Sequence, residues 1–203
     1  MTHPKISLTD FVDITSASGT PKHTKVKQAK NRPAYDPRFD FYKKLREGIV
    51  DAHNQHLGKK HLDTVMAGVT DTKKLTNYPN LVAGHKKWWG RKKLAWFDPP
   101  SKTYSAPGGL VEVRINPELG LEINGKPHLI KLYFKSNTVA KNKVDIITHL
   151  MKLALGAHAP ANTTMALLDI RNSKLICPTV PISGLTAMVQ AELAYVDSLW
   201  PNV

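Results

Sequence analysis

Three successive segments alternate apolar and polar residues, a period of two that is typical of β-strands with one buried face. The segments are residues 111–115, 119–123 and 130–135. Asn124 and Gly125 separate the second segment from the third, and this pair is the most favoured in a two-residue hairpin turn. A turn at this point predicts three cross-strand pairs: Glu122 with Pro127, Leu121 with His128, and Glu118 with Lys131. The pattern therefore predicts an antiparallel three-stranded meander.

Helical spacing of apolar residues surrounds this meander on both sides. The predicted helices are residues 7–14, 39–56, 60–68, 79–89, 141–155 and 185–199, and two further strands are predicted at 164–170 and 174–177. This order predicts an α+β fold, in which the meander and the further strands are flanked by helices and the N-terminal half is helical and basic.

Residues 15–38 combine Ser, Gly, Pro and spaced lysines with few large apolar groups, which predicts a flexible basic arm. We therefore expect residues 1–38 to form a short helix and this arm, and residues 39–203 to form a single globular domain. Within that domain the expected parts are a helical region, a strand-rich core and a C-terminal helix, at 39–93, 110–177 and 185–199.

Positive charge is concentrated in the first half of the chain. Residues 1–109 carry 20 Lys and Arg against 9 Asp and Glu, whereas residues 110–203 carry 9 against 7. The excess gathers in two stretches without an acid, residues 22–32 and 85–93. A polyanion is the partner that such a surface attracts most strongly, so DNA or RNA is the expected partner.

The candidate nucleic-acid-binding residues come from these two stretches. They are Lys22, Lys25, Lys27, Lys30, Arg32, Lys86, Lys87, Trp88, Trp89, Arg91, Lys92 and Lys93. Lysine and arginine would contact phosphates, and a tryptophan could stack on a base. The alternative is that the tryptophans anchor a helix in the core while the lysines only solvate its outer side. Because adjacent helical residues point about 100° apart, we expect at least one tryptophan to pack inward.

The polar face of the meander offers a second candidate site. Glu112, Glu122 and Lys131 are the candidate catalytic residues, because carboxylates can hold a divalent cation while a lysine orients or activates water. The alternative is a solvated sheet face on which opposite charges pair across strands.

The element order, the hairpin turn and the strand Leu129-Ile130-Lys131-Leu132-Tyr133-Phe134-Lys135 with its following helix resemble the core of the restriction-endonuclease-like, or PD-D/E-x-K, superfamily. The resemblance implies a metal-dependent nuclease with an acid at Glu118 or Glu122. In that family an acid-x-lysine motif lies on the next strand, where this chain has Lys131 and Tyr133, so the second acid is absent. The resemblance therefore favours a role with nucleic acid more than cleavage.

Several classes of partner and cofactor are not expected. No apolar run approaches the roughly 20 residues that cross a bilayer, so no membrane partner is predicted. The single cysteine excludes an intramolecular disulfide and favours a reducing, cytoplasmic location. We expect no metal and no cofactor, except Mg²⁺ or Mn²⁺ if the chain were a nuclease.

The sequence thus favours a non-catalytic nucleic-acid-binding protein. The alternatives are a divalent-metal-dependent nuclease and a protein-interaction or accessory subunit, in which a protein partner would dock on the tryptophan-containing helix and the final helix.

Overall fold

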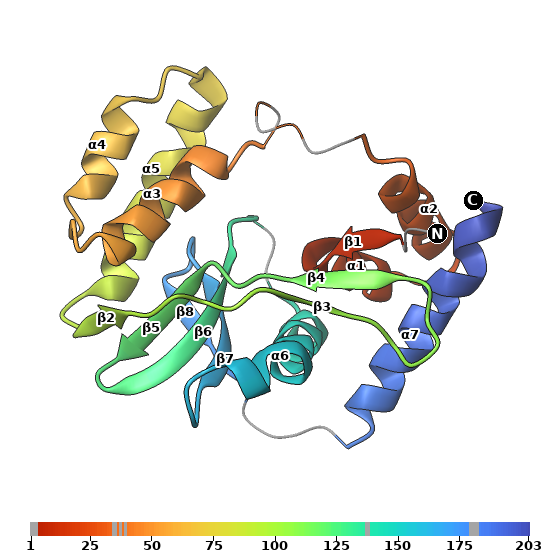
Figure 1. Ribbon diagram of the computed structural model, residues 1–203. Coiled ribbons are helices and arrows are strands. Elements are labelled where there is room, and N and C mark those ends of the chain that lie inside the picture. The colour runs from red at the N-terminus through yellow and green to blue at the C-terminus, as the bar shows by residue number, and fades with distance from the viewer. Residues whose placement is uncertain (1–3, 34–35, 37, 39, 137–138, 179–182) are drawn as a thin grey trace.

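The computed structural model describes residues 4–33, 36, 38, 40–136, 139–178 and 183–203. These residues form helices packed around two β-sheets (Figure 1), so the predicted α+β class is confirmed. None of the helices in the described ranges combines the length and the hydropathy that a membrane span requires.

Apart from residues 19–30, which the sequence predicted as part of a flexible arm, and one helix that begins seven residues before the predicted Pro79, the helices begin and end within four residues of the predicted positions. They are α1 (Leu8–Thr15), α2 (Gly19–Lys30), α3 (Lys43–Asn54), α4 (His61–Ala67), α5 (Thr72–Trp89), α6 (Lys141–Leu155) and α7 (Leu185–Leu199), with short 3₁₀ turns η1 (Gly156–His158) and η2 (Trp200–Asn202). The side chain of Ser7 accepts a hydrogen bond from the Asp10 amide at 3.1 Å and caps α1. Helix α5 begins at Thr72, whereas the sequence predicted that it begins at Pro79. The side chain of Asp71 caps the helix by accepting a hydrogen bond from the Lys74 amide at 2.9 Å.

The strands form two separate sheets. They are β1 (Lys5–Ser7), β2 (Leu94–Trp96), β3 (Lys102–Tyr104), β4 (Glu112–Ile115), β5 (Leu119–Ile123), β6 (Lys126–Tyr133), β7 (Thr164–Asp169) and β8 (Lys174–Ile176). One sheet has the order β2-β5-β6-β7-β8 and the other has the order β1-β4-β3. Strands β6 and β7 are parallel, and α6 connects them.

The hairpin between β5 and β6 has the predicted register. Leu121 lies opposite His128 and Glu122 lies opposite Pro127. Asn124 has φ 51° and Gly125 has φ 84°, the left-handed conformation that a two-residue turn of this kind requires at both positions. A local turn signal was therefore enough to define the pairing of these two strands.

The predicted three-stranded meander is wrong in one respect: β4 does not pair with β5. Strand β4 lies between β1, which is parallel to it, and β3, which is antiparallel. The buried side chains of β4 pack in a different core from those of β5. The alternation of apolar and polar residues located β4 correctly. Its partner β1 lies more than a hundred residues away and is only three residues long, so the pattern could not identify the pairing.

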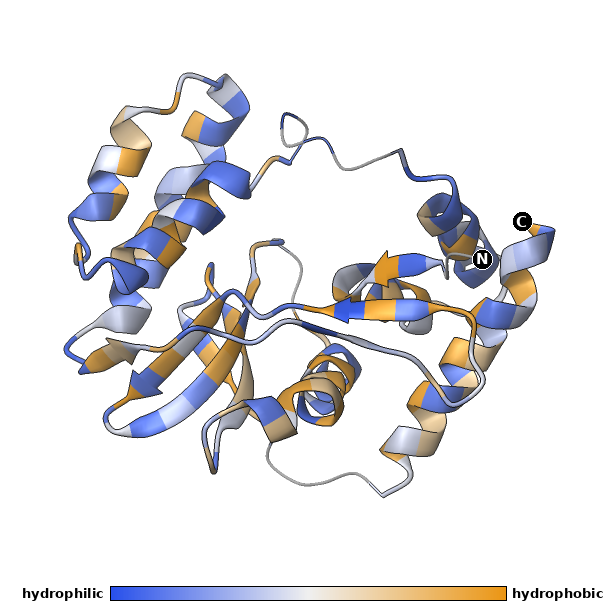
Figure 2. Ribbon diagram, viewed as in Figure 1, coloured by the Kyte–Doolittle hydropathy of each residue, from blue (hydrophilic) through white to orange (hydrophobic). Residues whose placement is uncertain are grey.

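Two hydrophobic cores cover the two faces of the five-stranded sheet. The first core includes residues of α1, β4, α6 and α7, and the second includes residues of α3, α5 and β5. Neighbouring residues of β6 alternate between them, with Leu129 in the first core and Ile130 in the second. The strands and α6 accordingly carry many hydrophobic residues (Figure 2). The predicted polar face of the meander is therefore partly covered by protein.

Residues 19–30 form helix α2 where the sequence predicted part of a flexible arm. Val26 of α2 is fully buried in the first core. Lys22 forms an ion pair with Glu192 of α7 and lies 4.3 Å from the centre of the Tyr195 ring. The remainder of α2 is mostly hydrophilic (Figure 2), and its sequence alone contains too little apolar surface to predict docking. Helix α2 packs on α7, an element from the other end of the chain.

Candidate nucleic-acid interface

The candidate cations form two groups on opposite sides of the molecule. One group lies on and after α2, beside α7, and the other lies at the C-terminal end of α5, beside β2 (Figure 1). The two basic stretches of the sequence therefore do not join into one surface, and each has to be considered separately.

Most cations of the α2 group already hold that helix to the fold. Besides the ion pair of Lys22, Lys30 donates to the carbonyl of Trp200 at 2.7 Å, and Arg32 pairs with Asp10 at 2.7 Å. Lys25 and Lys27 have no ion pair among the described residues. These contacts give Lys22, Lys30 and Arg32 a structural role, which leaves Lys25 and Lys27 as the candidates for contact with a ligand.

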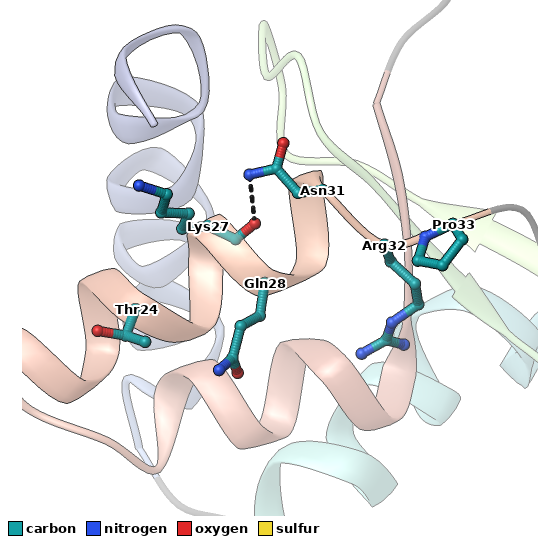
Figure 3. A pocket seen from close by; sticks show the side chains of 6 residues that line it. All are labelled: Thr24, Lys27, Gln28, Asn31, Arg32 and Pro33. Atoms are coloured by element: carbon teal, nitrogen blue, oxygen red, sulfur yellow. Dashed lines mark hydrogen bonds between the residues drawn. The ribbon is translucent and has the colours of Figure 1, made fainter.

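A cavity of about 480 Å³ lies on α2, lined by Thr24, Lys27, Gln28, Asn31, Arg32 and Pro33. Its two cations point in different directions, since Lys27 extends along one side of the helix and Arg32 extends toward α1 (Figure 3). Asn31 donates to the Lys27 carbonyl at 3.0 Å. The cavity therefore lacks a converging pair of cations that would hold an anion.

The second group includes cations that lie far from the stretch 85–93 in the sequence. Three segments that carry cations lie near one another, namely the α3–α4 loop, the end of α5 with β2, and the β5–β6 turn (Figure 1). We call this surface the basic corner, and it consists of Lys59, Lys60, Lys87, Arg91, Lys92, Lys93 and Lys126.

Specific contacts bring these three segments together. Lys59 donates to the carbonyl of Gly90, which joins the α3–α4 loop to the end of α5. The Lys93 amide donates to Oδ1 of Asn124 at 3.1 Å, and the Asn124 amide donates to the Lys93 carbonyl at 2.9 Å. Backbone pairing of β2 with β5 and of β5 with β6 then places Lys126 beside this junction. The basic corner is thus built on regular structure.

The three segments, residues 55–60, 87–93 and 124–126, contain no acid, and the exposed acid nearest to the hairpin turn is Glu122, which lies opposite Ala95 of β2. Lys86 is left out because it pairs with Asp63 at 2.5 Å. Lys92 donates to the carbonyl of Trp88 and, like Lys59, satisfies a carbonyl at the C-terminal end of α5. The exposed cations of the corner are Lys60, Lys87, Arg91, Lys93 and Lys126.

Sequence reasoning missed Lys59, Lys60 and Lys126 as members of this surface. They lie 25 or more positions from the predicted stretch 85–93, so a scan of charge along the chain does not group them with it. The turn signal at Asn124 and Gly125 does place Lys126 at a hairpin tip, and only the pairing of β2 with β5 brings that tip to Lys93.

Both tryptophans of the predicted stretch are engaged within the protein. Trp88 is buried in the second core, as expected for at least one of the pair. Trp89 is partly exposed, and the ring of His53 stacks on it at 4.1 Å with an interplanar angle of 26°. The ammonium of Lys59 lies 5.8 Å from the centre of the same indole. Neither ring is a free stacking platform.

A buried histidine pair lies beside Trp89. The Nε2 atoms of His53 and His85 are 3.0 Å apart, so one neutral ring donates its N–H to the other. Burial lowers the pKa of His53 to about 4. Burial also lowers the pKa of His85 well below its usual value, and the neighbouring His53 adds to the effect. Both rings are therefore uncharged at neutral pH and contribute no positive charge to the corner.

The three candidate catalytic residues do not come together. Glu112 is on β4, in the other sheet, where it pairs with Lys5 at 3.4 Å. Glu122 lies opposite Pro127, four positions from Lys131, a separation of about 13 Å along the strand. Sequence reasoning expected these side chains to share one face, and the assignment of β4 to a separate sheet is the reason that Glu112 does not.

Lys131 is instead held by Glu118, as the predicted register implied. Its Nζ lies 2.6 Å from Oε1 of Glu118, and each side chain is 12% exposed. The other carboxylate oxygen of Glu118 accepts from the Leu132 amide at 2.8 Å. Across the described ranges, no group of three or more His, Cys, Asp or Glu side chains is placed to hold a metal ion.

Compared with known proteins, the sequence matches no family model and no curated protein. The basic corner must therefore be interpreted from its own geometry and charge.

Proposed function

We propose that this protein binds nucleic acid without cleaving it, and that the basic corner is the principal contact surface. The observation that carries the proposal is that three separate segments, which together carry seven cations and contain no acid, meet at one place on the fold. Five of these side chains are exposed, and lysine and arginine on such a surface attract the phosphates of a polyanion. The single cysteine is consistent with action in the cytoplasm.

The chemistry of the corner favours contact with the backbone of the nucleic acid. Lysine ammonium groups neutralise phosphates and release condensed counterions, which supplies affinity without sequence information. The α2 group is a weaker candidate, because Lys22, Lys30 and Arg32 are already bound to other parts of the protein.

Cleavage is not part of this proposal. Lys131 is paired with Glu118 in a mostly buried position, and Glu112 lies in a different sheet from Glu122. The resemblance to the restriction-endonuclease-like superfamily stays a prediction about the core, and a protein-interaction role remains the alternative without a specific contact to favour it.

The proposal is tested with two variants of equal charge. The corner variant carries Lys87→Ala, Arg91→Ala and Lys93→Ala. The matched control carries Lys102→Ala, Lys152→Ala and Lys174→Ala, which are exposed residues on β3, α6 and β8. Both variants lose three positive charges, so any difference between them reflects position. Fluorescence anisotropy with labelled DNA and RNA at low salt measures the affinity.

We expect the corner variant to lose at least about 100-fold in affinity, since each lost phosphate contact costs roughly 1 kcal/mol. The control variant should lose much less. Equal losses in the two variants would mean that net charge alone attracts the ligand and that the corner is not the site. Recovered strands that are cut in the presence of Mg²⁺ or Mn²⁺ would contradict the non-catalytic assignment.

A further inference from the structure

We infer that the basic corner recognises paired nucleic acid by its backbone and binds a duplex more tightly than a single strand. This inference rests on the proposed function and concerns the form of the ligand. It follows from two features of the corner, the engagement of its aromatic rings and the distribution of its cations.

Proteins that prefer single strands combine a positive groove with aromatic rings on which unpaired bases stack. In the basic corner the two indoles that could do so are occupied. Trp88 belongs to the second core, and Trp89 is stacked on His53 with Lys59 over its ring. The ammonium of Lys59, which also donates to the Gly90 carbonyl, would compete with an unpaired base for the ring of Trp89.

A third indole near the corner is also engaged. Trp96 is the last residue of β2, three positions after Lys93, and its Nε1 donates to Oδ1 of Asp98 at 3.0 Å. The carboxylate of Asp98 adds negative charge beside this indole, which disfavours the approach of a phosphate. The corner therefore gains little from base stacking, a contribution of roughly 1–3 kcal/mol per base where it occurs.

The remaining attraction is electrostatic, and it depends on charge density. A duplex releases more counterions per neutralised phosphate than a single strand. The logarithm of the association constant falls with the logarithm of salt concentration by about 0.9 per contact for a duplex and by about 0.7 per contact for a single strand. For the five exposed cations the two slopes differ by about 1, so at about 0.1 M salt the duplex gains roughly tenfold over the single strand, relative to 1 M. Because base stacking contributes little here, we take the two forms to bind equally well at about 1 M salt, and the duplex is then preferred about tenfold at about 0.1 M.

Duplex DNA and duplex RNA both present two paired phosphate backbones, so the experiment tests each of them separately. Anisotropy competition at about 0.1 M salt compares four unlabelled competitors of equal nucleotide number: duplex DNA, duplex RNA, single-stranded DNA and single-stranded RNA. Each is tested against the wild-type protein and against Trp89→Phe, which keeps an aromatic ring beside His53 but reduces the surface for stacking. Thermal denaturation checks that this variant is folded.

The expected result is that both duplexes, or one of them, compete roughly tenfold better than either single strand. Trp89→Phe should change the single-strand and duplex affinities by the same factor. A single strand that competes better than the duplexes would overturn the inference, as would a selective loss of single-strand affinity in Trp89→Phe. In both of these cases the proposed function would stand, whereas failure of all four competitors to bind at low salt would contradict the proposed function itself.

Discussion

The Nε2 atoms of His53 and His85 meet at 3.0 Å in the core between α3 and α5, where the ring of Trp89 stacks on His53. Thirty-two positions separate the two residues in the chain. The pair joins the two helices that support the basic corner, and its neutral state links the stability of this part of the fold to pH.

The histidine pair predicts a loss of stability in mild acid. Burial holds the pKa of His53 at about 4, below the usual 6.5, so between these values the unfolded chain binds more protons than the folded one. The free energy of unfolding should therefore fall as pH decreases from about 6.5 to about 4, by roughly 3 kcal/mol from His53 alone, and His85, whose pKa burial also lowers, adds to this loss. Urea denaturation at several pH values measures this loss.

The double variant His53→Leu/His85→Leu should remove most of that pH dependence. His158→Gln, at an exposed position in η1, is the control and should keep it. The carboxylate of Asp13 titrates below this window, because hydrogen bonds from Lys135 and Lys143 outweigh its burial and lower its pKa. An unchanged pH profile in the double variant would show that other groups control the acid response.

The buried pair of Glu118 and Lys131 predicts a structural role for Lys131. Removing the lysine leaves a carboxylate with 12% exposure unpaired, so Lys131→Met should lower the free energy of unfolding by about 3 kcal/mol. Lys43→Met breaks the more exposed i,i+4 pair with Glu47, whose side chains are 35% and 57% exposed, and should cost less than about 1 kcal/mol. Chemical denaturation compares the two variants, and similar small losses would refute the structural assignment of Lys131.

The contact of α5 with the end of β7 predicts that Gly84 tolerates no side chain. A Cβ at Gly84 would lie 2.1 Å from the backbone carbonyl oxygen of Ile170, and a backbone group has little room to move. Gly84→Ala should destabilise the protein by about 2 kcal/mol or more, although alanine is the better helix former.

Gly156 provides the matched control for Gly84. It has helical dihedral angles, and a Cβ there would meet no atom within 4 Å. Gly156→Ala should therefore leave stability unchanged or raise it by about 0.5 kcal/mol. Thermal denaturation of both variants tests the prediction, and equal stability would argue against the close packing of α5 on Ile170.

The docking of α2 predicts that Val26 stabilises the N-terminal region. Its side chain is fully buried in the first core, so Val26→Ala should cost roughly 1–3 kcal/mol and increase amide hydrogen exchange in α2. Lys27→Ala, at the next and exposed position, should change stability by less than about 0.5 kcal/mol. Fast exchange of α2 amides in the wild-type protein would instead support the flexible arm that the sequence predicts.

Local patterns predicted most of the elements, and long-range partners account for what they missed. The register of β5 and β6 followed from Asn124 and Gly125, because a two-residue turn determines the pairing of its strands. In contrast, β4 alternates in the same way as β5 but pairs with β1 and β3. The docking of α2 depended on α7, whose contact with Lys22 spans 170 positions.

The candidate site was predictable only in part for the same reason. Charge along the chain identified Lys87, Arg91 and Lys93, because they are close in sequence. Lys59 and Lys126 join them only through the contacts at Gly90 and Asn124. The expected convergence of Glu112 with Lys131 failed because it assumed one sheet where the chain forms two.

The central claim is that the basic corner binds nucleic acid through phosphate contacts, and the salt dependence of affinity tests it most directly. For the wild-type protein, the logarithm of the association constant for duplex DNA should fall with the logarithm of salt concentration with a slope of about −4 to −5, from the five exposed cations. Lys93→Ala should make that slope shallower by about 1. An affinity that does not change with salt, or the absence of binding at low salt, would contradict the account.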